Sequence, residues 1–343
     1  MLDSVAGVGG GAYFAGPNDP IIKQIQAAAD FIGTGAIEIN MYEAEILDLV
    51  RRESILRQRV DERPATGHPH RYFEQTAIGT GQFSDPRTLA PTNTGPTRVE
   101  RPAMIKALVN QVNLTLFDVQ VTQQQGVFIG LEAKDIEDCV NGIIIAAAPA
   151  YWAGNDTSLS APTTLQYVGL LTQITYQFTV APGASIIDGI KYAVAQMMSN
   201  QTFRVRPTGI YLNPTLGHYI DTEAKNTQIV LGTTVIGGVT VKEINTQAGN
   251  LPLIPDVWMP SSTTAQYGFA APAAGLKNYF CAVVSEKMIE RPYIDGGKGN
   301  PAPQLFRLGL QNSLQGQYVS CQFDCIIAKG SSYAHSLLAV QRV

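Results

Sequence analysis

Three groups of residues in this sequence could carry out chemistry: a glycine run, a histidine pair and four cysteines. In the run SVAGVGGGAYFAGPNDP (residues 4–20), Gly7, Gly9 and Ala12 fit G-x-G-x-x-G/A, the spacing of dinucleotide-binding loops. That function needs a buried strand before the glycines and a helix after them, because the helix N-terminus holds the pyrophosphate. Only six residues precede Gly7, and two prolines follow Ala12. We therefore expect no cofactor here and interpret the run as a flexible N-terminal arm.

The histidines of HPH, residues 68–70, could supply half of a metal site. No cysteine or carboxylate cluster with ligand spacing accompanies them, so we expect no metal. The sequence also contains no H-E-x-x-H, G-x-S-x-G or G-x-x-x-x-G-K-S/T motif. We therefore expect no catalytic residues and interpret the chain as a non-enzyme.

The cysteines are predicted to be buried thiols. They are Cys139, Cys281, Cys321 and Cys325. In VSCQFDCII, residues 319–327, apolar residues and cysteines alternate with Ser320, Gln322 and Asp324, which predicts a strand with the cysteines on its apolar face. Four residues along a strand span roughly 13 Å. That separation is too large for Cys321 and Cys325 to form a disulfide or share a metal.

The charge balance argues against one class of protein. The chain has 24 basic and 28 acidic residues and a formal net charge of −4, whereas a DNA-reading protein carries a basic footprint. Charged residues make up 15% of the chain, against about 25% in typical domains. A monomer would therefore expose much uncharged surface. The simplest explanation is that neighbouring subunits cover it.

Charge is also unevenly distributed along the chain. Residues 43–63 hold eleven charged side chains, whereas residues 139–187 hold a single one, Asp156, and are expected to be largely buried. The longest apolar run, residues 143–153, is too short to span a bilayer and contains Pro149. The N-terminus has no secretory pattern. These features predict a soluble, intracellular protein without a membrane segment.

Local signals predict several helices and strands. Asp19-Pro20 starts a helix, and Ser185 with Asp188 forms a capping motif ahead of another. Pro149 is expected to kink or end the longest helix. Alternation over residues 109–121 slips after Leu116, which we interpret as a strand with a bulge. The predicted helices span residues 20–32, 131–152, 186–198 and 214–224, the last directly after a strand at 209–212.

Residues 68–102 form a long polar segment, rich in proline and glycine, that cannot bury a core of its own. Arg71–Glu74 and Thr97–Glu100 could pair as a long hairpin. A connection of this length within a compact domain is unusual and generally functional. We expect a strand pair that projects onto a neighbouring subunit.

The order of these elements resembles the major capsid protein fold of tailed bacteriophages, which encapsulins share. The resemblance is one of architecture and covers nearly the whole chain. Its closest sequence similarities are PTGIYLNPTLGHYI, residues 207–220, and CQFDCIIAKGSSYAHSLLAVQ, residues 321–341. It implies an α+β fold with an N-arm, an extended hairpin loop, a peripheral lobe with a spine helix near 131–152, and an axial lobe. The implied segments are 1–37 (N-arm), 66–105 (hairpin loop), 38–65, 106–160 and 285–343 (peripheral lobe) and 161–284 (axial lobe).

The same resemblance implies a structural protein that self-assembles into hexamers and pentamers of an icosahedral shell around phage double-stranded DNA. The chain would be assembled in the host cytoplasm and reside in the virion, without a cofactor and without a membrane. Its implied partners are other copies of itself, a portal, a separate scaffold protein and a decoration protein. The packaged DNA would make weak, non-specific contacts, which suits a mildly acidic container because a basic lining would bind phosphates.

Charged residues of the hairpin and of the loop 293–304 are the expected contacts between subunits. In the family, the loop corresponding to 293–304 meets its copies around local threefold axes, and some members crosslink a hairpin lysine to a neighbour's asparagine. Residues 66–105 contain no lysine, and the first one is Lys106, so we expect a shell without crosslinks. The candidate contact residues are Arg71, Glu74, Asp85, Arg87, Arg98, Glu100, Arg101, Asp295 and Lys298.

Three alternatives stay open on the sequence. The first is an encapsulin-type cage with the same fold and an enzyme cargo in place of DNA. The second is a carbohydrate-binding or adhesin module, suggested by strands rich in glycine, threonine and asparagine. The third is a hydrolase that uses Cys139 or Cys281 as its nucleophile.

Overall fold

The computed structural model describes residues 54–81, 83, 85, 87, 95–125, 131–227, 231–236, 239–311 and 315–343. The expected N-arm with its glycine run and the helix expected over 20–32 lie outside these residues. The chain divides into two compact units, Met1–Leu49 with Leu116–Leu131 and Val50–Thr115 with Glu132–Val343. Helix α5 (Leu116–Gln125) belongs to the first unit, and nearly all other described elements belong to the second.

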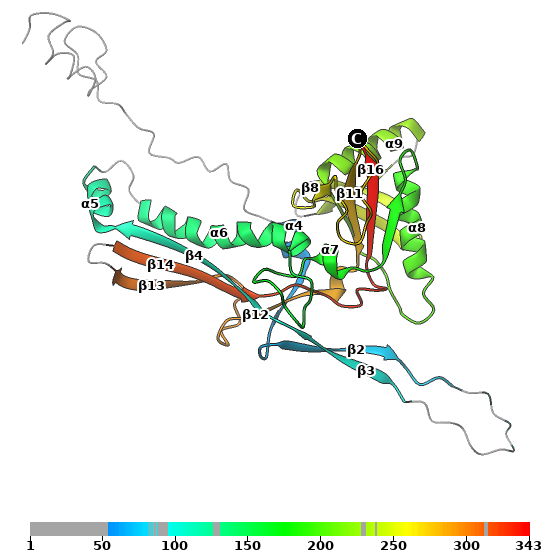
Figure 1. Cartoon of the computed structure of the whole chain (residues 1–343), viewed down its shortest axis with the longest axis horizontal. Coiled ribbons are helices and arrows are strands. Elements are labelled where there is room, and N and C mark those ends of the chain that lie inside the picture. Colours follow the sequence, from blue (N-terminus) through cyan, green and yellow to red (C-terminus); the bar gives the residue numbers. More distant parts are fainter. Residues whose placement is uncertain are drawn as a thin grey trace, which may run out of the picture. The chain divides into compact units, whose positions relative to one another are not determined.

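The second unit contains a six-stranded sheet built around the long antiparallel pair β4 and β14. Helix α6 (Leu131–Ala153) lies along one face of this sheet (Figure 1), where the Asn110 side chain donates to the Cys139 carbonyl at 2.9 Å. The spine helix expected over 131–152 is therefore present. It continues through Pro149 to Ala153 instead of ending there. The strands are β1 (Asp61–Pro64), β4 (Lys106–Thr115), β12 (Ile289–Ile294), β13 (Gln304–Gln311), β14 (Gln315–Asp324) and β15 (Ile327–Ala328), and β1 follows the short helix α4 (Ile55–Arg59).

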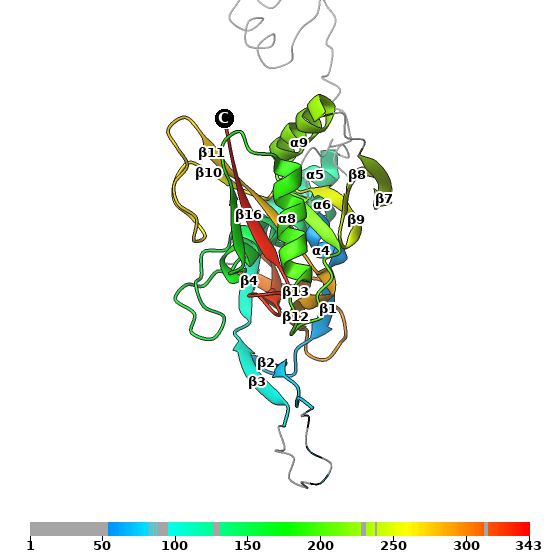
Figure 2. The same cartoon turned by 90° about the vertical axis from the view of Figure 1, so that its right-hand side faces the viewer.

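An eight-stranded sheet forms the rest of the unit, with α8 (Ile186–Met198) and α9 (Pro214–Thr227) packed against it (Figure 2). Ser185 caps α8 as predicted, because its hydroxyl accepts the Asp188 N–H at 3.1 Å. The strands are β5 (Gln177–Val180), β6 (Gly209–Leu212), β7 (Gly232–Ile236), β8 (Val239–Thr246), β9 (Gly249–Pro255), β10 (Ser261–Ser262), β11 (Lys277–Val284) and β16 (Ser336–Arg342), with α7 (Leu170–Gln173) before β5 and η1 (Glu286–Met288) before β12.

Strand β16 lies inside the eight-stranded sheet, between β5 and β11. Leu338 and Val340 pack into the core beneath α8 and α9, whereas Leu337 and Ala339 pack into the core on the opposite face. Burial on both faces explains why SLLAV is apolar throughout rather than alternating. The expected division grouped this segment with the rest of 285–343, whereas its hydrogen bonds join it to β5 and β11 of the eight-stranded sheet.

Two expectations about strands are wrong. The change of spacing after Leu116 marks the start of helix α5 rather than a bulge, because β4 ends at Thr115. On β14 the polar residues are the deeply buried ones: Ser320 and Asp324 have no exposed surface, whereas Phe323 is 38% exposed. For Asp324 the cause is a set of buried polar partners that the alternation pattern does not reveal, the Arg291 guanidinium and the Tyr151 and Tyr167 hydroxyls.

The expected hairpin is present as a separate two-stranded sheet of β2 (His70–Ala77) and β3 (Thr97–Ala103). Its strands run antiparallel from His70 opposite Ala103 to Ala77 opposite Thr97. The hairpin extends away from the two larger sheets in both views (Figures 1 and 2). Within the described part of the chain, no helix is both long and apolar enough to cross a membrane.

Candidate assembly surface

The base of the hairpin is firmly packed onto the six-stranded sheet. Tyr72 is 7% exposed and Ala103 is fully buried, and both join a small core with Ile105, Cys325 and Ile327. Burial raises the pKa of Tyr72 to about 12. The hairpin is therefore fixed to the subunit at its base rather than hanging from two loose strand ends.

Ion pairs within the hairpin use four of the nine predicted contact residues. Arg71 and Glu100 lie 2.6 Å apart across the strands, with 63% and 40% of their side chains exposed. Glu74 pairs with Arg101, and its other carboxylate oxygen accepts the Gly330 N–H at 2.9 Å. These residues thus hold the hairpin together within one subunit, and Glu74 also binds it to the subunit body.

The remaining predicted residues have different surroundings. Asp85 accepts the Arg87 N–H at 3.0 Å near the hairpin tip, where both residues are exposed, and Arg98 is exposed opposite Gln75. The Asp295 carboxylate instead turns inward and accepts the N–H groups of Gly297 and Asn300 at 2.9 and 2.6 Å. Burial raises the Asp295 pKa, but these backbone donors outweigh it and the pKa lies below its usual value. Asp295 therefore shapes the loop, and Lys298 is its exposed cation.

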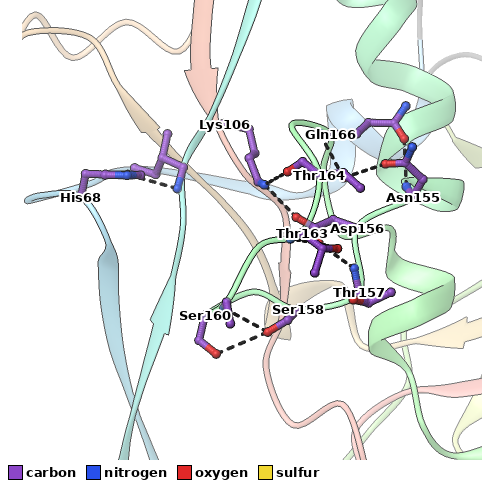
Figure 3. A network of polar contacts seen from close by, with 12 residues as sticks. His68, Lys106, Asn155, Asp156, Thr157, Ser158, Ser160, Thr163, Thr164 and Gln166 are labelled. Carbon is purple, nitrogen blue, oxygen red and sulfur yellow. Dashed lines mark hydrogen bonds and ion pairs between the residues drawn. The ribbon is translucent and has the colours of Figure 1, made fainter.

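A buried ion pair joins the exit of the hairpin to the loop after α6 (Figure 3). Lys106 Nζ lies 2.7 Å from Asp156 Oδ2 and donates to the Thr164 carbonyl at 2.5 Å. The other Asp156 oxygen accepts the N–H groups of Thr157 and Thr163 at 2.8 and 3.0 Å. Asp156 has no exposed surface. The sequence contained a sign of this pair, because Asp156 is the single charged residue of residues 139–187. A charged residue in a segment that is otherwise buried needs a partner.

The Asp156 pair predicts a specific pH dependence of stability. Burial raises the Asp156 pKa, but Lys106 and the backbone donors outweigh burial and lower it below its usual value. A carboxylate with a lowered folded-state pKa stabilises the fold above its unfolded-state pKa, and this contribution is lost as the pH falls through the folded-state value. We expect Asp156→Asn to lower the free energy of unfolding by about 2 kcal/mol at pH 7, with the difference from wild type shrinking below about pH 5.

Thermal unfolding of unassembled subunits at several pH values measures this difference. The matched control is Asp221→Asn, which removes an exposed pair with Lys242 at 2.5 Å and should change stability by less than about 1 kcal/mol. If Asp156→Asn lowers the free energy of unfolding by the same amount at pH 7 and at pH 3, the ionised Asp156 carboxylate is not the source of the stabilisation.

The residues that could have carried chemistry occupy structural positions. His68 Nδ1 accepts the Ile105 N–H at 3.4 Å, and burial lowers the pKa of His70. All four cysteines are free and buried, as expected. Complete burial raises the Cys281 pKa to about 12, the opposite of an activated nucleophile. Over the described ranges, no group of three or more histidine, cysteine or acidic side chains could hold a metal ion.

Apolar side chains are exposed on the hairpin and on the six-stranded sheet. Strand pairing places Val109, Phe306, Leu308 and Phe323 on one face of β4, β14 and β13. This face is opposite the one that carries Asn110 and contacts α6. Each of the four is at least 38% exposed, and the hairpin adds Phe73, Ile78 and Phe83 at 68%, 71% and 110% exposure. Such a concentration of exposed apolar surface is typical of a surface that contacts another protein.

A second buried network, which the sequence did not reveal, ties the spine helix to the strands. The Asp324 carboxylate accepts from Arg291 Nη1 at 2.8 Å, from the Tyr151 hydroxyl at 3.2 Å and from the Tyr167 hydroxyl. Arg291 also pairs with Glu62 of β1. Burial lowers the Arg291 pKa, but the Tyr151 hydroxyl and the carboxylates of Asp324 and Glu62 outweigh it, and the pKa lies above its usual value.

Comparisons with known proteins identify this architecture. No family model and no curated protein matches the sequence. Solved structures match it at low identity over most of its length. The capsid of an empty GTA particle is 13% identical with a TM-score of 0.62, covering 91% of this chain and 98% of its own. The head structure of Helicobacter pylori bacteriophage KHP40 is 10% identical with a TM-score of 0.61, covering 89% and 94%.

An encapsulin matches on the same terms. The SrpI encapsulin of Synechococcus elongatus PCC 7942 is 11% identical with a TM-score of 0.57, covering 92% of this chain and 94% of its own. The α+β architecture expected from the order of elements is thereby confirmed. The chain has the major capsid protein fold of tailed bacteriophages, which the encapsulin shares.

Proposed function

We propose that this chain is a major capsid protein, a structural subunit that self-assembles into the hexamers and pentamers of an icosahedral shell around phage double-stranded DNA. The observation that carries the proposal is the hairpin of β2 and β3, which leaves the subunit with Phe73, Ile78 and Phe83 exposed. A lone subunit gains nothing from an apolar projection, whereas a shell subunit covers it with a neighbour. The low charge fraction, 15%, agrees with extensive contact between subunits.

The proposed division into lobes follows the sheets. The six-stranded sheet with α6 would form the peripheral lobe, and the eight-stranded sheet with α8 and α9 the axial lobe. Strand β16 is assigned to the axial lobe on its pairing with β5 and β11, which revises the expected boundary. The loop with Lys298 at its exposed end would meet its copies around local threefold axes. The same proposal places the chain in the virion. It also includes a portal, a scaffold protein and a decoration protein as partners, and DNA that is held by weak contacts.

Electron microscopy of the expressed protein in negative stain tests the proposal directly. We expect closed shells or tubes with a regular lattice. A clean monomer at high protein concentration would contradict it. Particles purified from nuclease-treated lysate then separate a phage capsid from an encapsulin-type cage, because a cage carries protein cargo in place of double-stranded DNA.

We also predict that the shell is not covalently crosslinked. Residues 66–105 contain no lysine, and Lys106 is held by the buried Asp156, with only 11% of its side chain exposed. An amine buried in this pair and bound to the Thr164 carbonyl cannot reach a side chain of a neighbouring subunit. Shells boiled in denaturant should therefore run as one band near 36.9 kDa on a denaturing gel. A ladder of higher bands would show that another lysine is used.

A further inference from the structure

The hairpin consists of two parts that meet at Glu74. We call residues 70–74 and 99–103 the stem, and residues 75–98 the arm. The stem contains Tyr72 and Ala103, which are buried against the six-stranded sheet. Just beyond the stem, the Met104 N–H donates to the Leu159 carbonyl at 2.8 Å. Past Glu74, the described residues Ala77, Ile78 and Arg98 are exposed.

Glu74 is the last side chain of β2 that holds the stem to the subunit body. One oxygen of its carboxylate accepts the Gly330 N–H at 2.9 Å, and the other pairs with Arg101 on the opposite strand. Only 10% of the Glu74 side chain is exposed, against 53% for Arg101. The carboxylate therefore faces inward toward the body and is not available to a neighbour.

Gly330 provides a rigid anchor for this carboxylate. It lies in the link between β15 of the six-stranded sheet and β16 of the eight-stranded sheet. Its φ is +68°, and an added Cβ would lie 2.9 Å from the Tyr333 ring, so the turn has little freedom. The adjacent Lys329 reinforces the same contact, because its ammonium lies 5.5 Å from the centre of the Tyr72 ring and 2.6 Å from the buried Glu290.

We propose that Glu74 is a positioning residue within the subunit, whose carboxylate holds the stem on the turn at Gly330 and sets the direction in which the arm leaves. This inference rests on the proposed shell function and changes the role expected for Glu74, from contact with a neighbour to aiming the arm. Every subunit of a ring carries the same arm. A change in its direction is therefore repeated at each interface, and the ring fails to close or closes at another curvature.

Three substitutions test the proposal on the full chain. Glu74→Gln keeps an oxygen that can accept the Gly330 N–H and should assemble like wild type. Glu74→Ala removes that acceptor, and Glu74→Asp keeps the charge but withdraws it by one methylene. For both we expect hydrogen exchange in the peptide around Gly330 to rise by about tenfold in unassembled subunits. We also expect the yield of regular shells to fall by about tenfold, because the weakened contact recurs around the shell.

The matched control is Glu100→Gln, which breaks the exposed pair with Arg71 on the same stem without touching the body. It should leave shell yield and diameter unchanged. Shells of normal yield and diameter from both Glu74→Ala and Glu74→Asp would overturn the proposal. If Glu74→Ala does not fold, Glu74→Asp decides the question. Failure of wild-type protein to form shells would instead contradict the proposed function.

Discussion

Asp324→Asn is expected to lower the free energy of unfolding of the unassembled subunit by about 3–5 kcal/mol, the usual cost of breaking a buried ion pair. Asp324 has no exposed surface, and Arg291 is 1% exposed. An asparagine of similar size leaves the Arg291 guanidinium with one carboxylate, that of Glu62. It also weakens the acceptor of the Tyr151 and Tyr167 hydroxyls, which Asp324 binds together.

Chemical denaturation of a double-mutant cycle measures this effect. Arg291→Met alone should also be destabilising, because it leaves Asp324 as a buried carboxylate without its cation. The double variant with Arg291→Met and Asp324→Asn should lose clearly less than the sum of the two single losses, because neither charge is then left buried without its partner. The control Tyr167→Phe removes one donor only and should cost about 1–2 kcal/mol.

If the free energy of unfolding of the Asp324→Asn variant lies within about 1 kcal/mol of that of wild type, the network contributes little to stability. A double variant as unstable as the sum of the single ones would show that Asp324 and Arg291 do not act as a pair.

Local signals in the sequence predicted the helices well. The Ser185 cap of α8 and the start of α9 at Pro214 depend on neighbouring residues, and the structure confirms both. The pairing of residues 71–74 with 97–100 as a hairpin was also predicted, whereas the exact register, with Glu74 opposite Val99, was not. Pro149 was expected to kink or end its helix, and the helix does not end there, since Tyr151 and Trp152 beyond it are buried in the core.

The polar networks could not be predicted from spacing. Asp324 receives donors from Tyr151 on α6, from Tyr167 and from Arg291 on β12, and Lys106 reaches Asp156 in a separate loop. Only the tertiary fold brings these groups together. The alternation on β14 therefore placed Asp324 on the exposed side, whereas its partners elsewhere in the chain make its burial favourable.

For the same reason, the partners that the charged hairpin residues have within the subunit could not be predicted, and their contacts with other subunits stay a prediction. Arg71, Glu74, Glu100 and Arg101 are on the hairpin as expected, but they pair with one another within the subunit. Charged residues in an extended segment indicate that ion pairs form. They do not indicate whether the partner lies in the same subunit or in a neighbouring one. The exposed apolar residues Phe73 and Ile78 are the better indicators of a contact with another subunit.

Removal of the arm is expected to abolish shell formation while leaving the subunit folded. Glu74 and Val99 are cross-strand partners, so residues 75–98 can be replaced by Asn-Gly, which closes antiparallel strands in a two-residue turn. The stem core of Tyr72, Ala103 and Ile105 lies outside the deletion. The free energy of unfolding of the shortened subunit should therefore lie within about 1 kcal/mol of that of wild type. In size-exclusion chromatography, the shortened subunit should nevertheless elute as a small species at concentrations where wild type forms shells.

A matched variant separates loss of reach from loss of apolar contact. Ile78→Ser with Phe83→Ser keeps the length of the arm and removes two side chains that are 71% and 110% exposed in the lone subunit. If a neighbour covers these two side chains, each substitution removes about 1.5–3 kcal/mol of stabilisation by apolar burial, and it does so only in the assembled state. The threshold concentration for assembly should then rise by at least about tenfold, with unchanged stability of the unassembled subunit.

The two variants together locate the contact. Failure of both to assemble indicates that the arm acts through its apolar tip, and light scattering against protein concentration gives the threshold for each. Failure of the deletion alone indicates that the arm contributes through its backbone and its charged residues Asp85, Arg87 and Arg98. Normal shells from the deletion variant would contradict the role of the hairpin in assembly, because its exposed apolar surface would then have no function in the shell.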